Sequence, residues 1–199
     1  MTTQTKPSPA AGIVQLPLRR FTVEEYYAMA EAGILTEDDR VELIDGVIVE
    51  IAPVGSRHVG VVNGYTRALT EAVKRRAVVQ VQSPIRLDDG TEPQPDIVLL
   101  QERPDLYASG HAGPQDILLV IEVADTSVGY DRNEKLPRYA RAGIPEVWLT
   151  ILPDRVIEAH TEPADGRYAV RRIFAPGDTI SPDCFPDIAL SVDEILPGQ

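Results

Sequence analysis

Apolar and polar residues recur along the chain with two periods, one typical of helices and one typical of strands. Apolar residues follow a helical spacing from Val23 to Ala30, behind a Thr22–Glu25 pair that has the form of a capping box, and again from about His58 to Arg76. Apolar and β-branched runs predict strands over the segments 78–82, 85–87, 97–100, 117–123, 146–152, 155–161 and 168–174. Helices and strands are therefore mixed along the chain.

The clearest local signal is the Asp45-Gly46 pair, which separates the apolar runs 41–44 and 47–49. Asp-Gly between apolar runs is typical of a two-residue β-hairpin. We therefore expect a β-hairpin over 41–49, in a chain of the α/β (α+β) class with a hairpin-rich sheet. One domain is expected over residues 20–196, after a flexible tail at residues 1–19 that is rich in Pro, Thr and Ala.

A third helix is expected after Asp131, which forms a capping-box pattern with Glu134. Leu136, Tyr139 and Ala140 then share one face. Pro137 falls in the second turn, so we expect a kink or a later start of this helix. A short helix near 192–196 completes the chain, and the segment 102–114 is expected to be a loop or one short helix.

Composition narrows the class of protein. The 199 residues are 43% hydrophobic and 25% charged, and 19 basic against 31 acidic groups give a net charge of −12. So acidic a surface argues against non-specific coating of nucleic acid but leaves room for a local basic site. The sequence contains no run of about 18 apolar residues, so no membrane-spanning helix is expected. The single cysteine, Cys184, forms no intramolecular disulfide and fits a reducing cytoplasm.

Lysine is rare in this chain, because 16 of the 19 basic residues are arginine and only Lys6, Lys74 and Lys135 are lysine. A lysine retained against that preference is a weak indication of chemistry that a guanidinium cannot perform.

Three acids interrupt apolar strands and are the main candidates for chemistry. Asp96 opens a strand after Pro95, Glu122 follows five apolar residues, and Glu42 lies between Val41 and Leu43. An ionised carboxylate at a buried strand end is costly unless a cation or several donors stabilise it. Mg²⁺ is one such cation, while water, an arginine or backbone donors are ordinary alternatives. Spacing alone does not show that the three acids meet.

Several motifs, taken in order, resemble the Uma-type restriction endonuclease family of bacteria, within the PD-(D/E)XK nuclease superfamily. Pro95-Asp96 is followed 26 residues later by Glu122-Val123-Ala124. The other matching stretches are VELIDG at 41–46, His58 after a Pro/Gly/Ser turn, YDRNEK at 130–135 and YARAGIPEVW at 139–148. The resemblance covers residues 20–175. It implies a restriction-endonuclease-like core, a mixed β-sheet flanked by helices with an N-terminal β-hairpin, built for metal-dependent phosphodiester cleavage.

The resemblance also implies roles for individual residues. Asp96 and Glu122 would bind Mg²⁺, or Mn²⁺ as a substitute, with the carbonyl of Val123 as a further ligand, and Glu42 would reach the metal directly or through water. The lysine expected two residues after Glu122 is Ala124, and Lys135 on the following helix stands in for it. Lys135 beside carboxylates is expected to stay charged and to act by positioning and electrostatics. The alternative for Lys135 is a solvated pair with Asp131.

Other candidates are weaker. His58 near a helix start is a possible phosphate contact, or a surface or capping histidine. Arg132 and Arg138, with Lys135 and Arg141, form a basic strip that fits a nucleic-acid backbone or, alternatively, a solvated face paired with acids. Cys184 lies in no recognisable nucleophile motif.

The sequence thus favours a Mg²⁺-dependent endonuclease acting on DNA, for which the resemblance implies a homodimer. The acidic composition and the lack of a long apolar run predict no membrane partner. A second hypothesis is a non-catalytic binding module or scaffold that keeps the nuclease fold, consistent with the charge of −12. A third is a metal-dependent hydrolase of small phosphates, which requires a closed pocket.

Overall fold

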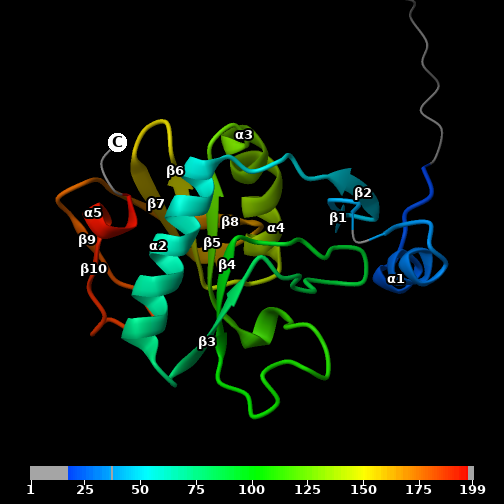
Figure 1. Ribbon diagram of the computed structural model, residues 1–199, viewed down its shortest axis with the longest axis horizontal. Helices are drawn as coiled ribbons and strands as arrows, with labels where there is room; N and C mark the ends of the chain where they lie inside the picture. The colour runs from blue at the N-terminus through cyan, green and yellow to red at the C-terminus, as the bar shows by residue number, and fades with distance from the viewer. Residues whose placement is uncertain (1–17, 37, 197–199) are drawn as a thin grey trace, which may run out of the picture.

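A six-stranded mixed sheet forms the centre of the protein in the computed structural model, which describes residues 18–36 and 38–196 (Figure 1). Most of the expected tail at 1–19 lies outside the described residues. In spatial order the strands are β3 (Ala77–Val81), β4 (Ile97–Gln101), β5 (Ile117–Ala124), β6 (Glu146–Ile151), β7 (Val156–Ala164) and β8 (Arg167–Phe174). Only β5 and β6 are parallel, and the other neighbours are antiparallel. The expected mixed α/β fold is confirmed.

Both faces of the sheet are buried, as the apolar run of β4 indicates. Ile97 and Leu99 belong to one hydrophobic cluster, and Val98 and Leu100 belong to another. Successive side chains of a strand point to opposite faces, so the two clusters lie on opposite sides of the sheet.

Different helices cover the two faces. The first cluster includes residues of α2 (Ser56–Val73), β9 (Thr179–Ile180), β10 (Leu190–Ser191) and α5 (Val192–Ile195). The second includes Leu136 and Tyr139 of α4 (Leu136–Arg141), which follows α3 (Val128–Tyr130) and a π-helical segment, η2 (Asp131–Lys135).

The parallel pairing of β5 and β6 places this second helical segment next to the end of β5. Parallel strands need a crossover connection, and here α3, η2 and α4 supply it. The crossover starts where β5 ends, so η2 lies close to that end of the sheet. A 3-10 turn, η1 (Pro114–Asp116), precedes β5.

The expected hairpin forms a separate two-stranded sheet, β1 (Val41–Ile44) and β2 (Val47–Glu50), that lies with α1 (Val23–Glu31) beside the main sheet (Figure 1). Asp45 and Gly46 have φ values of 47° and 73°, as a type I′ turn requires. A Cβ at Gly46 would lie 2.5 Å from the Cβ of Arg20, so glycine is also needed for this close approach.

The structure departs from the sequence prediction at two points. Residues 85–87 form no strand: Ile85 makes only an isolated bridge with Ala112. The capping box at Asp131 is also wrong, because Asp131 is helical with φ −61° and the helical segment begins earlier, at Val128. The irregularity expected from Pro137 takes the form of the π-helical turn before it, since proline lacks the N–H that a regular helix needs.

Among the helices of the described residues, none is both long and apolar enough to cross a lipid bilayer.

Candidate active site

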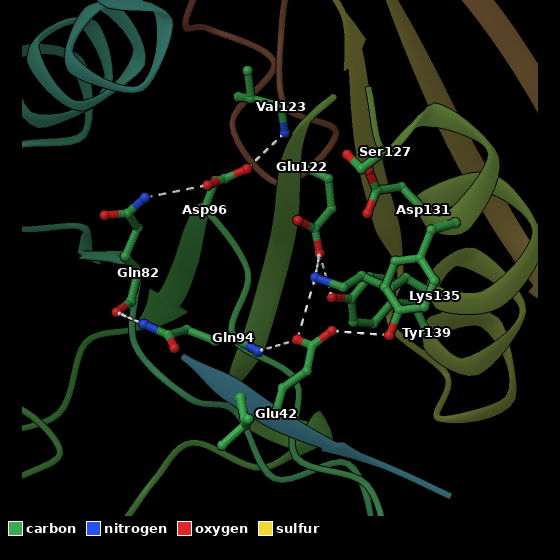
Figure 2. Close-up of polar contacts among 12 residues, drawn as sticks. Glu42, Gln82, Gln94, Asp96, Glu122, Val123, Ser127, Asp131, Lys135 and Tyr139 are labelled. Atoms are coloured by element: carbon green, nitrogen blue, oxygen red, sulfur yellow. Dashed lines mark hydrogen bonds and ion pairs between the residues drawn. The ribbon is translucent and has the colours of Figure 1, made fainter. Parts of the chain in front are cut away.

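Asp96 and Glu122 lie at the same end of the sheet. Ile97 pairs with Ile121 in the antiparallel β4–β5 register, so the residues just beyond this pair are Asp96 and Glu122. The Val123 amide donates to Asp96 Oδ2 over 2.8 Å, which fixes the Asp96 carboxylate against β5 (Figure 2).

His58 contacts Asp96 from the first turns of α2. Its Nε2 lies 3.0 Å from Asp96 Oδ1, and both side chains are largely buried. Its Nδ1 is buried without a hydrogen-bond partner among the described residues. The geometry thus assigns His58 to Asp96, whereas the phosphate contact expected from the sequence stays a prediction.

Lys135 lies between two glutamates that are far apart in sequence. Its ammonium is 3.2 Å from Glu122 Oε1 and 3.4 Å from Glu42 Oε2. The cluster is buried: Glu122 is 4% exposed, Glu42 is 3% exposed and Lys135 is 8% exposed. Figure 2 shows the three side chains, which come from β5, β1 and η2, converging on one point.

Two tyrosines and one backbone amide orient the same glutamates. Tyr139, fully buried on α4, donates to Glu122 Oε1 over 2.6 Å. Tyr130 donates to Glu42 Oε1, and the Gln94 amide donates to Glu42 Oε2, both over 3.0 Å. These donors hold each carboxylate in one orientation without adding charge.

Asp131 is a fourth buried acid beside the cluster. It is 4% exposed and accepts a hydrogen bond from the Ser127 hydroxyl at 2.6 Å. Burial raises its pKa, while Lys135 and the Ser127 hydrogen bond oppose that rise. Asp131 therefore adds to the negative field around Lys135 and does not cap the helix.

The cluster perturbs the pKa values of its members in opposite senses. The pKa of Glu122 is raised to about 8: burial is the largest cause, Asp131 and Asp96 act in the same direction, and Lys135 and the Tyr139 hydrogen bond oppose them. Burial disfavours the Lys135 ammonium, but the surrounding carboxylates outweigh this and raise the pKa of Lys135. Lys135 therefore stays protonated, whereas Glu122 binds a proton far more readily than an exposed glutamate does.

A cavity of about 520 Å³ opens beside these residues. Six carboxylates and two permanent cations line it: Glu42, Glu50, Asp96, Glu122, Asp125 and Asp131, with Arg40 and Lys135. A further wall is apolar and comes from β2 and the following loop, including Val49, Ile51, Pro53 and Val54. The excess of carboxylates makes the cavity attractive to cations.

The donor set fits a hard divalent cation. In the part of the chain that the structure describes, no three His, Cys, Asp or Glu side chains are arranged to hold a metal ion by themselves. The main chain offers a further ligand: the Ala124 carbonyl accepts from Leu152 on the β6 side, and the Val123 amide faces Asp96. N–H and C=O of one strand residue point the same way, so the Val123 carbonyl also faces Asp96. Two carboxylates, one carbonyl and water are ligands that Mg²⁺ accepts.

Arg132 and Arg138 are not among the residues that line the cavity. Arg132 forms an ion pair of 3.0 Å with the buried Glu158 on β7. Arg138 pairs with Asp45 at 2.6 Å and with Glu134 at 2.9 Å. Their roles in phosphate binding stay predictions, and their observed contacts connect η2 and α4 to neighbouring elements.

Tyr130, Tyr139 and Asp131 complete the cluster although the sequence did not single them out for the site. A tyrosine on an otherwise apolar helix face is a usable signal, because a buried hydroxyl needs a hydrogen-bond partner. Asp131 was hidden by its resemblance to a helix cap.

Two comparisons with known proteins show the family and the fold of this chain. A family model named Uma2 and described as "Putative restriction endonuclease" matches residues 23–193. A crystal structure from Anabaena variabilis, described as a putative nuclease belonging to DUF820, superposes with a TM-score of 0.67 at 16% sequence identity. The match covers 88% of this chain and 97% of the other, and at this identity it establishes a shared fold. No curated protein matches.

Proposed function

The chain belongs to the Uma2 family, and from this premise we propose that it is a metal-dependent nuclease that hydrolyses phosphodiester bonds of DNA. The observation that carries the proposal is the Lys135 ammonium, 3.2 Å from Glu122 and 3.4 Å from Glu42, beside the cavity that Asp96 lines. A buried cation surrounded by carboxylates at one end of a nuclease-like fold is suited to a reaction that builds up negative charge.

Asp96, Glu122 and the Val123 carbonyl are the residues that would hold the cation, with Mg²⁺ or Mn²⁺ as the candidates. When bound, such a cation polarises the phosphate and lowers the pKa of a water molecule. The carboxylate excess in the cavity supports this requirement, because phosphate is repelled from the lining as it stands.

Lys135 acts in this proposal as a fixed positive charge. Its raised pKa keeps the ammonium protonated, so it offsets charge on the phosphoryl oxygens and orients Glu42, and it does not serve as a general base. Glu42, held by Tyr130 and the Gln94 amide, is positioned to accept a hydrogen bond from water in the cavity. Cleavage of both strands of DNA would take two copies of the chain, so we include a homodimer in the proposal.

The proposal is tested by cleavage of plasmid and oligonucleotide substrates with Mg²⁺ or Mn²⁺. We expect wild type to cut, and Asp96→Ala and Lys135→Ala to lose about 100-fold or more. Asp154→Asn, an exposed carboxylate in the turn between β6 and β7, is the control and should retain activity. Circular dichroism shows whether each variant is folded.

Equal activity in all variants would reject the assignment of the site. Two results together would favour the second candidate, a non-catalytic scaffold that keeps the fold. Folded wild type would show no cleavage with any metal, and calorimetric titration with Mg²⁺ would show no binding. The acidic lining and the net charge of −12 support this candidate, because both repel the phosphates of a nucleic acid.

A further inference from the structure

Arg40 differs from the other cation that lines the cavity, Lys135, because its guanidinium has no hydrogen-bond or ion-pair partner in the described part of the chain. Lys135 is held by Glu42 and Glu122. Arg40 lines the same cavity, is exposed, and makes no side-chain hydrogen bond or ion pair with the described residues.

The backbone aims Arg40 toward the site. The Arg40 carbonyl accepts a hydrogen bond of 2.8 Å from the Ile51 amide, which continues the β1–β2 ladder by one pair beyond Val41 and Glu50. Arg40 is therefore in an extended segment two residues before Glu42. Residues two apart in an extended segment share one face, so the strand that brings Glu42 to Lys135 also brings Arg40 to that side.

Other arginines near the cavity are committed elsewhere. Arg57, at the start of α2, donates to the Leu152 carbonyl over 3.1 Å. Arg132 and Arg138 are paired with Glu158, Asp45 and Glu134. A cation that is not already paired favours the approach of a polyanion to a cavity lined by six carboxylates. Arg40 is such a cation among the residues that line the cavity.

We propose that Arg40 binds a phosphate of the nucleic-acid strand adjacent to the phosphate that is cleaved. This inference rests on the proposed nuclease function and adds a substrate-positioning residue to it. Arginine suits the role because its planar guanidinium contacts two phosphate oxygens at once. The contact carries no base information, so it is expected on any sequence.

The test measures binding of fluorescein-labelled DNA by fluorescence anisotropy, with Ca²⁺ in place of Mg²⁺, from about 50 to 200 mM salt. Arg40→Ala should weaken binding about tenfold at low salt. It should also reduce the slope of log affinity against log salt by about 0.9 on duplex, or about 0.7 on a single strand, as expected for one phosphate contact. Arg40→Lys should restore the slope and part of the affinity, because an ammonium keeps the charge without the two-pronged contact.

Arg67→Ala is the matched control. Arg67 is an exposed arginine on α2 that does not line the cavity and makes no side-chain contact with the described residues. It removes the same charge from the protein, so it should leave affinity and slope unchanged. In cleavage assays, Arg40→Ala should raise KM and leave kcat nearly unchanged.

Unchanged affinity and slope in Arg40→Ala, or an equal loss in Arg67→Ala, would overturn the role of Arg40 while leaving the nuclease proposal intact if wild type cleaves. Absence of both DNA binding and cleavage by wild type would overturn the two proposals together.

Discussion

Two buried glutamates on neighbouring strands look alike by ordinary measures of a functional site. Glu122 lies near the end of β5 and lines a cavity of about 520 Å³, and Glu146 begins β6 and lines a second cavity of about 490 Å³. Burial raises the pKa of Glu122 to about 8 and that of Glu146 to about 7. Since β5 and β6 are parallel, the two glutamates lie at opposite ends of the sheet.

The two glutamates differ in the groups that contact their carboxyl oxygens. Glu146 accepts hydrogen bonds from Trp148 Nε1 at 2.6 Å and from the Asp183 amide at 2.7 Å, and these neutral donors satisfy both of its oxygens. Glu122 shares a permanent cation with Glu42 and faces further acids. Glu146 is thus a satisfied structural group, whereas Glu122 belongs to a cluster with unbalanced charge.

A cavity and a raised pKa are therefore insufficient to identify an active site in this protein. What distinguishes the Glu122 end is the convergence of several acids from different elements on one amine, an arrangement that is concentrated at functional sites. Equivalent substitutions at Glu122 and Glu146 test this distinction.

The largest contrast is expected in catalysis. Glu122→Gln should reduce cleavage about 100- to 1000-fold, because an amide cannot supply the ionised carboxylate that a bound cation would require. Glu146→Gln should leave cleavage within about twofold, since a neutral group at the far end of the sheet does not change the field at the phosphate. Initial rates under Mg²⁺ check both variants, and similar losses in the two would contradict the distinction.

The next largest effect is on the pH dependence of stability. The folded-state pKa of Glu146 is raised to about 7 from an ordinary value of 4.5, so between these pH values the native state holds a proton that the unfolded state has lost. The contribution of Glu146 to stability therefore falls by about 3 kcal/mol as pH rises through this window, and it is constant above pH 7. The raised pKa of Glu122 lowers stability over an overlapping range, so the comparison is between wild type and a Glu146 variant.

Glu146→Gln should flatten the profile in this window by that amount. Its amide group must face a donor, either Trp148 Nε1 or the Asp183 amide, so the variant loses stability at all pH values and only the slope is informative. Urea unfolding from about pH 4.5 to 7.5 measures the slope, and parallel profiles for wild type and variant would show that burial does not perturb Glu146.

The fold was largely predictable from sequence because its signals are local. The Asp45-Gly46 turn needs two positive φ values, and the long apolar runs of β4 and β5 need burial on both faces. Residues 85–87 show the limit, because a short apolar run becomes a strand only when a partner runs beside it over several residues.

The site was predictable only in part. Asp96, Glu122 and Glu42 stand out in sequence because a charge is costly in an apolar strand. Their approach to Lys135 depends on the β4–β5 register, the crossover through η2 and the docking of the hairpin, which no local pattern encodes. Tyr139 was assigned only to a helix face, because its partner Glu122 is 17 residues away in the sequence. Asp131 was assigned to a helix cap, because the sequence does not reveal the π-helical turn that it begins.

Stabilisation of the protein by divalent cations should depend on the carboxylates at the Glu122 end of the sheet and not on Glu146. A ligand that binds the native state adds about 2.7 kcal/mol at 100 times its dissociation constant, so we expect Mg²⁺ to raise the melting temperature of wild type and of Glu146→Gln by several degrees. Asp96→Asn should abolish this shift. Thermal melts with and without Mg²⁺ provide the measurement, and a shift retained in Asp96→Asn would place the cation elsewhere.

The smallest expected effect concerns the hydroxyl that orients Glu122. Tyr139→Phe removes the 2.6 Å hydrogen bond to Glu122 Oε1 but keeps the ring in the core, so stability should fall by about 1 kcal/mol. Cleavage should fall several-fold through kcat, because the carboxylate gains freedom that Lys135 alone does not restrict. Tyr168→Phe is the matched control: its hydroxyl donates over 2.9 Å to the Ile144 carbonyl outside the cavity, so its loss should lower stability by a similar amount and leave kcat unchanged. If both variants lower kcat equally, the effect comes from general loosening of the core and Tyr139 has no special part in holding Glu122.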